Sequence, residues 1–225
     1  MIKRIAEQIP IWLEMTIVMM LCFGLPTLVS IYDFLSGRAF ERVEISDNRI
    51  VALLIYESVV SAITVGFLYL RGYRIWQQLR FGTSIKGIAI GAGSVVAVVM
   101  AYASLWILVN LLVISLFHSK IAVATYSITV SLPFVLVLSL INPLFEEAFL
   151  LGYMLDRLCG ASVWVFIGVT TIIRISYHLY QGWVGILALL PTGVIMAFVY
   201  WKTRNLMPVF FAHALMDMTG LLWSH

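Results

Sequence analysis

Seven stretches of mostly apolar residues, each at least 17 residues long, follow one another along this chain of 225 residues. They lie at about 10–32, 50–70, 87–116, 128–155, 161–180, 184–201 and 206–223. An α-helix needs about 20 such residues to cross the roughly 30 Å hydrocarbon layer of a bilayer. The pattern therefore predicts an all-α polytopic membrane protein with about seven transmembrane helices.

The composition agrees with a protein whose outer surface faces lipid. The chain is 62% hydrophobic and only 11% charged, and a soluble domain of this size could not cover so much apolar surface. The net charge is +3 and the basic residues are spread over short loops, so the expected partner is the lipid bilayer and not nucleic acid. Cys22 and Cys159 lie in or beside apolar runs and are expected to be free thiols.

The charges of the loops predict the orientation. The basic start runs into an apolar stretch with no cleavage site of the A-x-A type, so an uncleaved first span is expected. A cytoplasmic N-terminus and an outer C-terminus put nine basic residues inside and four outside, which favours this arrangement. Short loops favour a bacterial plasma membrane, and the outer loop 33–49 is expected to be a hydrophilic turn. The nine inner residues are Lys3, Arg4, Arg71, Arg74, Arg80, Lys86, Arg157, Lys202 and Arg204.

A few ionisable residues interrupt the apolar stretches. They are Glu14, Glu57, Glu146, Glu147, Arg174, His178, His213 and Asp217. Glu14 and Glu57 are interpreted as reaching the headgroups or making a single hydrogen bond between helices. The other six lie on three helices of the second half, where an unpaired charge costs several kcal/mol. Ionisable residues at such depth predict a functional site.

The spacing of these six residues predicts that they meet. His213 and Asp217 are four residues apart and share one helix face, and Arg174 and His178 have the same spacing. Glu146 and Glu147 differ by about 100° around their helix, so only one can point squarely at a given site. Pro143 predicts a kink just before them.

The inventory of side chains favours hydrolysis. A buried glutamate beside imidazoles can take a proton from water, and the imidazoles can orient that water, hold a metal or stabilise an oxyanion. The chain has no G-x-S-x-G and no H-E-x-x-H, which argues against a serine hydrolase and a soluble zincin. Packed, hydrogen-bonded histidines and a proton- or ion-translocating bundle remain as alternatives at this point.

Three short stretches resemble the motifs of a known family. FEEAFLLGY, RISYHLYQG and NLMPVFFAHALMD are similar, in order and spacing, to the EExxxR, FxxxH and HxxxN/D motifs of the CPBP family of intramembrane proteases, named for CAAX and bacteriocin processing. The resemblance covers about residues 140–220. It implies a single membrane domain, residues 1–225, in which 1–120 form three spans without motifs. Residues 121–225 would form a four-helix peptidase core opening toward the cytoplasm.

The resemblance also implies roles for individual residues. Glu146 would be the general base that activates water, and His178 and His213 would bind the water, a metal or the oxyanion. Asp217 would complete the site, and Glu147 would be a supporting carboxylate. A zinc ion held by His178, His213 and Asp217 is one alternative, and glutamate-activated water without a metal is the other. The implied substrates are membrane-associated: lipidated tails, leader peptides or bacteriocin precursors. A regulatory membrane partner or a homo-oligomer is compatible with this assignment.

Two positions depart from the family pattern. Leu151 stands where EExxxR has arginine, and Arg174 stands where FxxxH has an aromatic residue. We hypothesise that Arg174 supplies the missing guanidinium and pairs with Glu147, because an unpartnered charge is costly there. The alternative is an inactive scaffold or a bacteriocin-immunity protein. A proton-coupled transporter would show repeat symmetry, whereas these polar residues are confined to the second half.

The position of His178 along its helix poses a geometric problem. Counted from residue 161, it lies about 26 Å into the helix, deeper than Glu146 and His213 lie in theirs. The uncharged turn LYQGWVG that follows can lie within the protein, below the outer interface. We therefore expect the fifth helix to begin late or to tilt strongly.

Overall fold

The computed structural model describes residues 9–118 and 125–222, so Lys3, Arg4 and Lys120 lie outside the described residues. The first half contains three long helices. The first is built from α2 (Ile11–Met19), the π-helix η1 (Met20–Gly24) and α3 (Leu25–Leu35); the others are α4 (Asp47–Leu70) and α6 (Ile85–Phe117). The short helix α5 (Ile75–Gln78) lies between α4 and α6.

The second half contains four helices among the described residues. The first is continuous from α7 (Leu132–Glu147) through the π-helix η3 (Ala148–Tyr153) to α8 (Met154–Arg157). After it come α9 (Val163–Ser176), the 3₁₀ turn η4 (Leu179–Gln181), α10 (Gly182–Thr203) and α11 (Leu206–Leu222).

The prediction of an all-α polytopic membrane protein is confirmed. Five helical segments of the described residues are long and apolar enough to cross a membrane: Ile11–Leu35, Asp47–Leu70, Ile85–Phe117, Leu132–Arg157 and Leu179–Thr203. The 14 residues of α9 and the 17 of α11 are shorter. At 1.5 Å per residue they span about 21 and 26 Å, less than the hydrocarbon layer, so seven full spans are not established.

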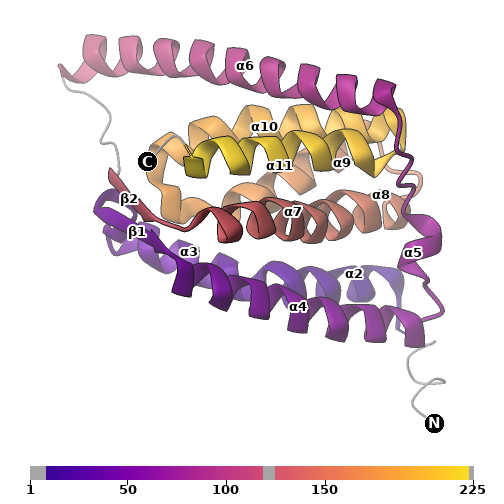
Figure 1. Ribbon diagram of the computed structural model, residues 1–225. Helices are drawn as coiled ribbons and strands as arrows, with labels where there is room; N and C mark the ends of the chain where they lie inside the picture. The colour runs from indigo at the N-terminus through magenta and orange to yellow at the C-terminus, as the bar shows by residue number, and fades with distance from the viewer. Residues whose placement is uncertain (1–8, 119–124, 223–225) are drawn as a thin grey trace.

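The helix with the glutamate pair lies in the middle of the bundle. In Figure 1, α6 forms one side and α2, α3 and α4 form the opposite side, with α7, α9, α10 and α11 between them. α7 packs against both α4 and α11, and α6 packs against α10 and α11. Within the apolar windows, 61% of the residues of Leu132–Arg157 are buried but only 6% of those of Ile85–Phe117. The central helix can therefore carry polar side chains away from lipid.

One end of the bundle carries a small sheet. The strands β1 (Arg42–Ser46) and β2 (Thr125–Thr129) pair in parallel, and the 3₁₀ turn η2 (Arg38–Phe40) precedes them. The β-branched residues of RVEIS and TYSIT favour extended backbone. Predicting loop 33–49 as a hydrophilic turn was therefore wrong, because α3 continues to Leu35 and β1 occupies the loop's second half.

Glu14 anchors the other end of the bundle. Its carboxylate is only 1% exposed and accepts hydrogen bonds from Arg71 Nε at 2.6 Å and from the Tyr153 hydroxyl at 3.0 Å. Arg157 Nη2 lies 2.8 Å from the same carboxylate. The interpretation of Glu14 as a headgroup or single-bond contact was wrong, because three donors from two other helices surround it. These contacts tie the first helix and the end of α4 to the helix that carries Glu146.

Candidate active site

Glu146 and Glu147 are the last two residues of α7, directly before the π-helix of the central helix. Pro143 lies inside α7 and lacks the N–H that would bind the carbonyl one turn earlier. The departure from α-helical geometry follows the pair, as the six-residue π-helix η3. Such π-helical turns are frequent at functional sites. Both carboxylates are buried at this junction.

Glu147 is held by three hydrogen bonds. Arg174 Nη2 donates to each of its carboxylate oxygens at 2.8 Å, and His213 Nδ1 lies 2.6 Å from Oε1. Arg174 comes from the last turn of α9 and is buried, as is Glu147. The Arg174–Glu147 contact expected from the sequence is therefore present. It places a fixed positive charge beside the pair of carboxylates.

Glu146 is held through one oxygen. The Tyr177 hydroxyl donates to Oε2 at 2.6 Å, and Arg174 Nη1 donates to the same atom at 3.3 Å. Within the described part of the chain, no donor is found on Oε1. One oxygen of Glu146 is thus positioned and the other remains for a water molecule or a substrate.

Both histidines are oriented through Nδ1. His178 Nδ1 lies 3.0 Å from the Arg174 carbonyl oxygen, and His213 Nδ1 lies 2.6 Å from Glu147. A carbonyl and a carboxylate only accept hydrogen bonds, so Nδ1 carries the hydrogen in each ring. Nε2 is therefore the second nitrogen of each ring; it faces Asp217 in His213 and has no hydrogen-bond partner among the described residues in His178. Fixing one nitrogen to set the state of the other is usual for catalytic and metal-binding histidines.

Asp217 completes the cluster on α11. Its Oδ1 lies 3.4 Å from His213 Nε2, and its Oδ2 accepts a hydrogen bond from Asn142 Nδ2 at 3.1 Å. Sequence reasoning missed Asn142 and Tyr177. An amide in an apolar helix one turn before Glu146, and a phenol directly before His178, were signals that could have found them.

The predicted site residues come together, with one looser member. A chain of contacts runs through Asn142, Asp217, His213, Glu147, Arg174, Glu146 and Tyr177. His178 is joined to it through the Arg174 carbonyl oxygen, 3.0 Å from Nδ1. It makes no hydrogen bond to the carboxylates of the cluster in the described residues. The structure therefore supplies one connected polar cluster with His178 at its edge.

The short α9 resolves the depth problem of His178. The helix begins at Val163 and ends at Ser176, so His178 lies in the turn that follows. In that turn Tyr180 N–H donates to the buried Ser30 Oγ at 2.8 Å, and the Thr27 and Ser176 hydroxyls lie 3.2 Å apart. The turn is thus packed on α3, within the protein. The first half of the chain positions His178.

We expect Ser30→Ala to lower activity by displacing His178. The substitution leaves the Tyr180 N–H without its acceptor, at a cost of about 1–3 kcal/mol. A shift of the turn by a fraction of an ångström should then lower kcat more than it raises KM, because His178 is predicted to act on the reacting atoms. Kinetics in detergent or nanodiscs measure the change. Ser104→Ala on the exposed face of α6 is the matched control, and equal kinetics for the two variants would contradict the positioning role.

A complete zinc site is not assembled by these residues. In the described residues, Glu146, Glu147 and His213 offer ligand atoms within 4.8 Å of one another. Glu147 is already occupied by Arg174 and His213, and a cation there would lie against the guanidinium. The 3.4 Å between His213 Nε2 and Asp217 Oδ1 suits one edge of a tetrahedral zinc site with bonds of about 2.0–2.1 Å. His178, the third predicted ligand, contacts neither residue within the described part of the chain. The fit is therefore partial.

Comparison with known proteins gives a family-model match to the second half of the chain. Residues 128–219 match the family model described as Type II CAAX prenyl endopeptidase Rce1-like, and this segment contains all the residues of the cluster. No curated protein and no solved structure matches the chain. The five long apolar helices indicate an integral membrane protein, and the match supports an intramembrane protease kind of function. The matched segment is less than half of the chain, so the likeness to this family is a likeness of residues 128–219. The division at residue 120 stays a prediction.

Proposed function

We propose that the protein is an intramembrane endopeptidase that hydrolyses a peptide bond of a membrane-associated substrate through water activated by Glu146. The observation that carries this proposal is that some polar groups of the cluster are fixed by hydrogen bonds and others have no such partner. Glu147, Arg174 and Tyr177 hold the site, while Oε1 of Glu146 and Nε2 of His178 have no hydrogen-bond partner among the described residues and Nε2 of His213 lies beside Asp217. Such preorganisation is what a hydrolytic site requires.

Glu146 acts as the general base in this proposal. Its Oε1 takes a proton from the water as the water oxygen bonds to the substrate carbonyl carbon. Tyr177 and Arg174 keep Oε2 fixed, so Oε1 keeps its direction during the transfer. The same proton then passes from Glu146 to the leaving nitrogen as the C–N bond breaks. The products are an amine and a carboxylic acid that loses its proton to solvent, and Glu146 returns to its starting state.

The histidines serve the water and the oxyanion. His178 Nε2 accepts a hydrogen bond from the attacking water and turns the oxygen lone pair toward the carbonyl. Each nitrogen of His213 faces a carboxylate, Glu147 at Nδ1 and Asp217 at Nε2, which favours a second proton on this ring. Its Nε2–H then donates to the substrate oxygen as negative charge develops.

The orientation and the substrates complete the proposal. The segment 71–86 contacts the segments 156–163 and 202–206 at the end of the bundle opposite the sheet, through Tyr73–Asp156, Gly82–Asn205 and Arg80–Leu206. They carry most of the basic residues counted above, so this end is assigned to the cytoplasm.

The substrates would be lipidated tails, leader peptides or bacteriocin precursors, with the membrane that of a bacterium.

The test is a cleavage assay in nanodiscs. The purified protein is incubated with membrane-anchored peptides of these three classes, and products are identified by mass spectrometry. Cleavage of at least one class within its membrane-proximal part is expected. A folded protein that cleaves none of them, but is retained on a membrane partner, would support the scaffold alternative instead.

We expect cleavage to survive chelation. Arg174 already supplies a positive charge to Glu146 and Glu147, and the zinc fit is partial, so glutamate and histidine suffice for water activation. Activity should be the same in 1,10-phenanthroline and in its non-chelating 1,7 isomer. Loss of activity in the 1,10 isomer alone, with about one zinc per chain by elemental analysis, would assign a zinc to His178, His213 and Asp217 instead.

A further inference from the structure

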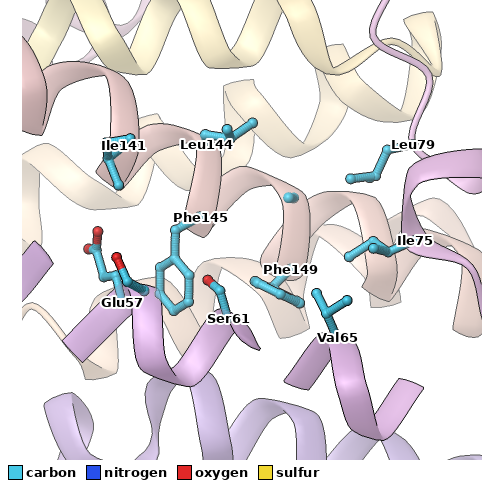
Figure 2. Close-up of a pocket in the computed structure, with 11 residues that line it drawn as sticks. Glu57, Ser61, Val65, Ile75, Leu79, Ile141, Leu144, Phe145 and Phe149 are labelled. Carbon is cyan, nitrogen blue, oxygen red and sulfur yellow. The ribbon is translucent and has the colours of Figure 1, made fainter. Parts of the chain in front are cut away.

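An apolar cavity lies beside the candidate active site. It has a volume of about 190 Å³ and lies between α4 and the face of α7 and η3 that carries Phe145 and Phe149. Figure 2 shows Ile75 and Leu79 of the α5 region at one end and Glu57 at the other. Ser58 and Ile141 beside Glu57 are exposed, so the cavity opens between α4 and α7. The cavity has one polar end and a long apolar remainder.

Glu57 is a buried carboxylate that the mechanism has not used. It is 2% exposed, and its Oε2 has no hydrogen-bond partner in the described part of the chain. The interpretation as a headgroup or hydrogen-bonded residue therefore fails for this oxygen. An acid retained there without a partner costs free energy that a bound group can offset.

Glu57 belongs to the electrostatic environment of the reaction. Phe145, which lines the same cavity as Glu57, directly precedes Glu146 in α7. The guanidinium of Arg174 is directed at Glu146 and Glu147. The described residues around the reaction thus contain four carboxylates, Glu57 included, against the Arg174 guanidinium and the His213 ring, so a further positive charge would complement Glu57.

The proposed hydrolysis creates such a charge. When the C–N bond breaks, the scissile nitrogen changes from an amide N–H into an amine that takes a further proton from solvent. This nitrogen is attached to the residue that follows the cleaved bond, and the side chain of that residue needs a place beside it. A cavity with a carboxylate at one end, apolar walls beyond and Phe145, the neighbour of Glu146, in its lining matches this pair of groups.

We propose that this cavity is the leaving-group subsite of the enzyme. Glu57 accepts a hydrogen bond from the scissile N–H and then binds the product ammonium, while the apolar side chain of that residue lies along Phe145 and Phe149. The inference rests on the proposed function. It assigns a substrate-binding role to α4, which lies outside the family match.

The test uses matched ligands that mimic the product. Phenylalanine amide carries a free ammonium and an apolar side chain, and N-acetylphenylalanine amide lacks the charge. Binding is measured as thermal stabilisation of the protein in nanodiscs and as competitive inhibition of cleavage. We expect the free amine to bind roughly ten- to a hundredfold more tightly, as a charge-assisted hydrogen bond implies. Glu57→Gln should remove this preference, and Glu44→Gln on the exposed part of β1 should keep it.

A second variant tests the cavity itself. Ser61→Leu fills the space while Glu57 is retained, so it should shift the preferred ligand from phenylalanine amide to alanine amide. Equal binding of the free and acetylated ligands, or an unchanged preference in Glu57→Gln, would overturn the inference. Because stabilisation is measured without turnover, a protein that binds the free amine but never cleaves would refute the proposed function and leave only an amine-binding cavity at Glu57.

Discussion

Glu146→Gln is expected to lower the rate of peptide cleavage about 10²–10⁴-fold, the usual contribution of a general base. Glutamine has nearly the volume of glutamate, and its amide oxygen can still accept the bonds from Tyr177 and Arg174. It cannot take a proton from water. The loss should therefore appear in kcat, with little change in the affinity for substrate.

Two comparisons make this result interpretable. Glu44→Gln makes the same chemical change on the exposed part of β1 and should leave cleavage unchanged. Thermal unfolding of Glu146→Gln in the same nanodiscs should show a folded protein. A variant that keeps full activity would exclude Glu146 as the base. If cells that carry Glu146→Gln in place of the wild-type protein behave like wild-type cells although the variant cleaves nothing, the scaffold alternative gains support.

The helical period accounts for what the sequence predicted well. His213 and Asp217 lie four residues apart on α11, and the structure places them side by side. The Arg174–Glu147 pair was predicted from charge balance. Leu151 replaces the arginine of the family motif, so the buried negative charge of Glu147 needed another cation, and Arg174 supplies it. Local spacing and charge balance are both properties that a single sequence displays.

Contacts between distant segments could not be predicted. Asn142 meets Asp217 across 75 residues, and β1 pairs with β2 across a comparable separation. These depend on how far each helix slides along its neighbours, which apolar composition does not specify. The same limit explains why the number of full spans was not predicted. The turn after α9 is uncharged and packs on α3, and composition does not distinguish such a protein environment from lipid.

Arg174→Leu is expected to destabilise the protein by about 3–5 kcal/mol, the usual cost of removing one partner of a buried ion pair. Glu147 is 0% exposed and would keep only His213, and Glu146 would keep only Tyr177. Two acids in a buried site would then lack their shared cation. We expect a lower unfolding temperature and no measurable cleavage. Arg49→Leu, at the exposed start of α4, is the matched control and should change neither.

The sharper form of this prediction adds Leu151→Arg to Arg174→Leu. Leu151 is buried in η3, four residues after Glu147, and the wide turn of the π-helix keeps the two on similar faces. An arginine there can reach the same carboxylates, as the family motif has it. The double variant should therefore recover part of both stability and cleavage, whereas Leu151→Arg alone adds an unpaired buried charge and should destabilise. Normal stability of Arg174→Leu, or equal damage from Leu151→Arg in both backgrounds, would mean that Arg174 does not replace the motif arginine.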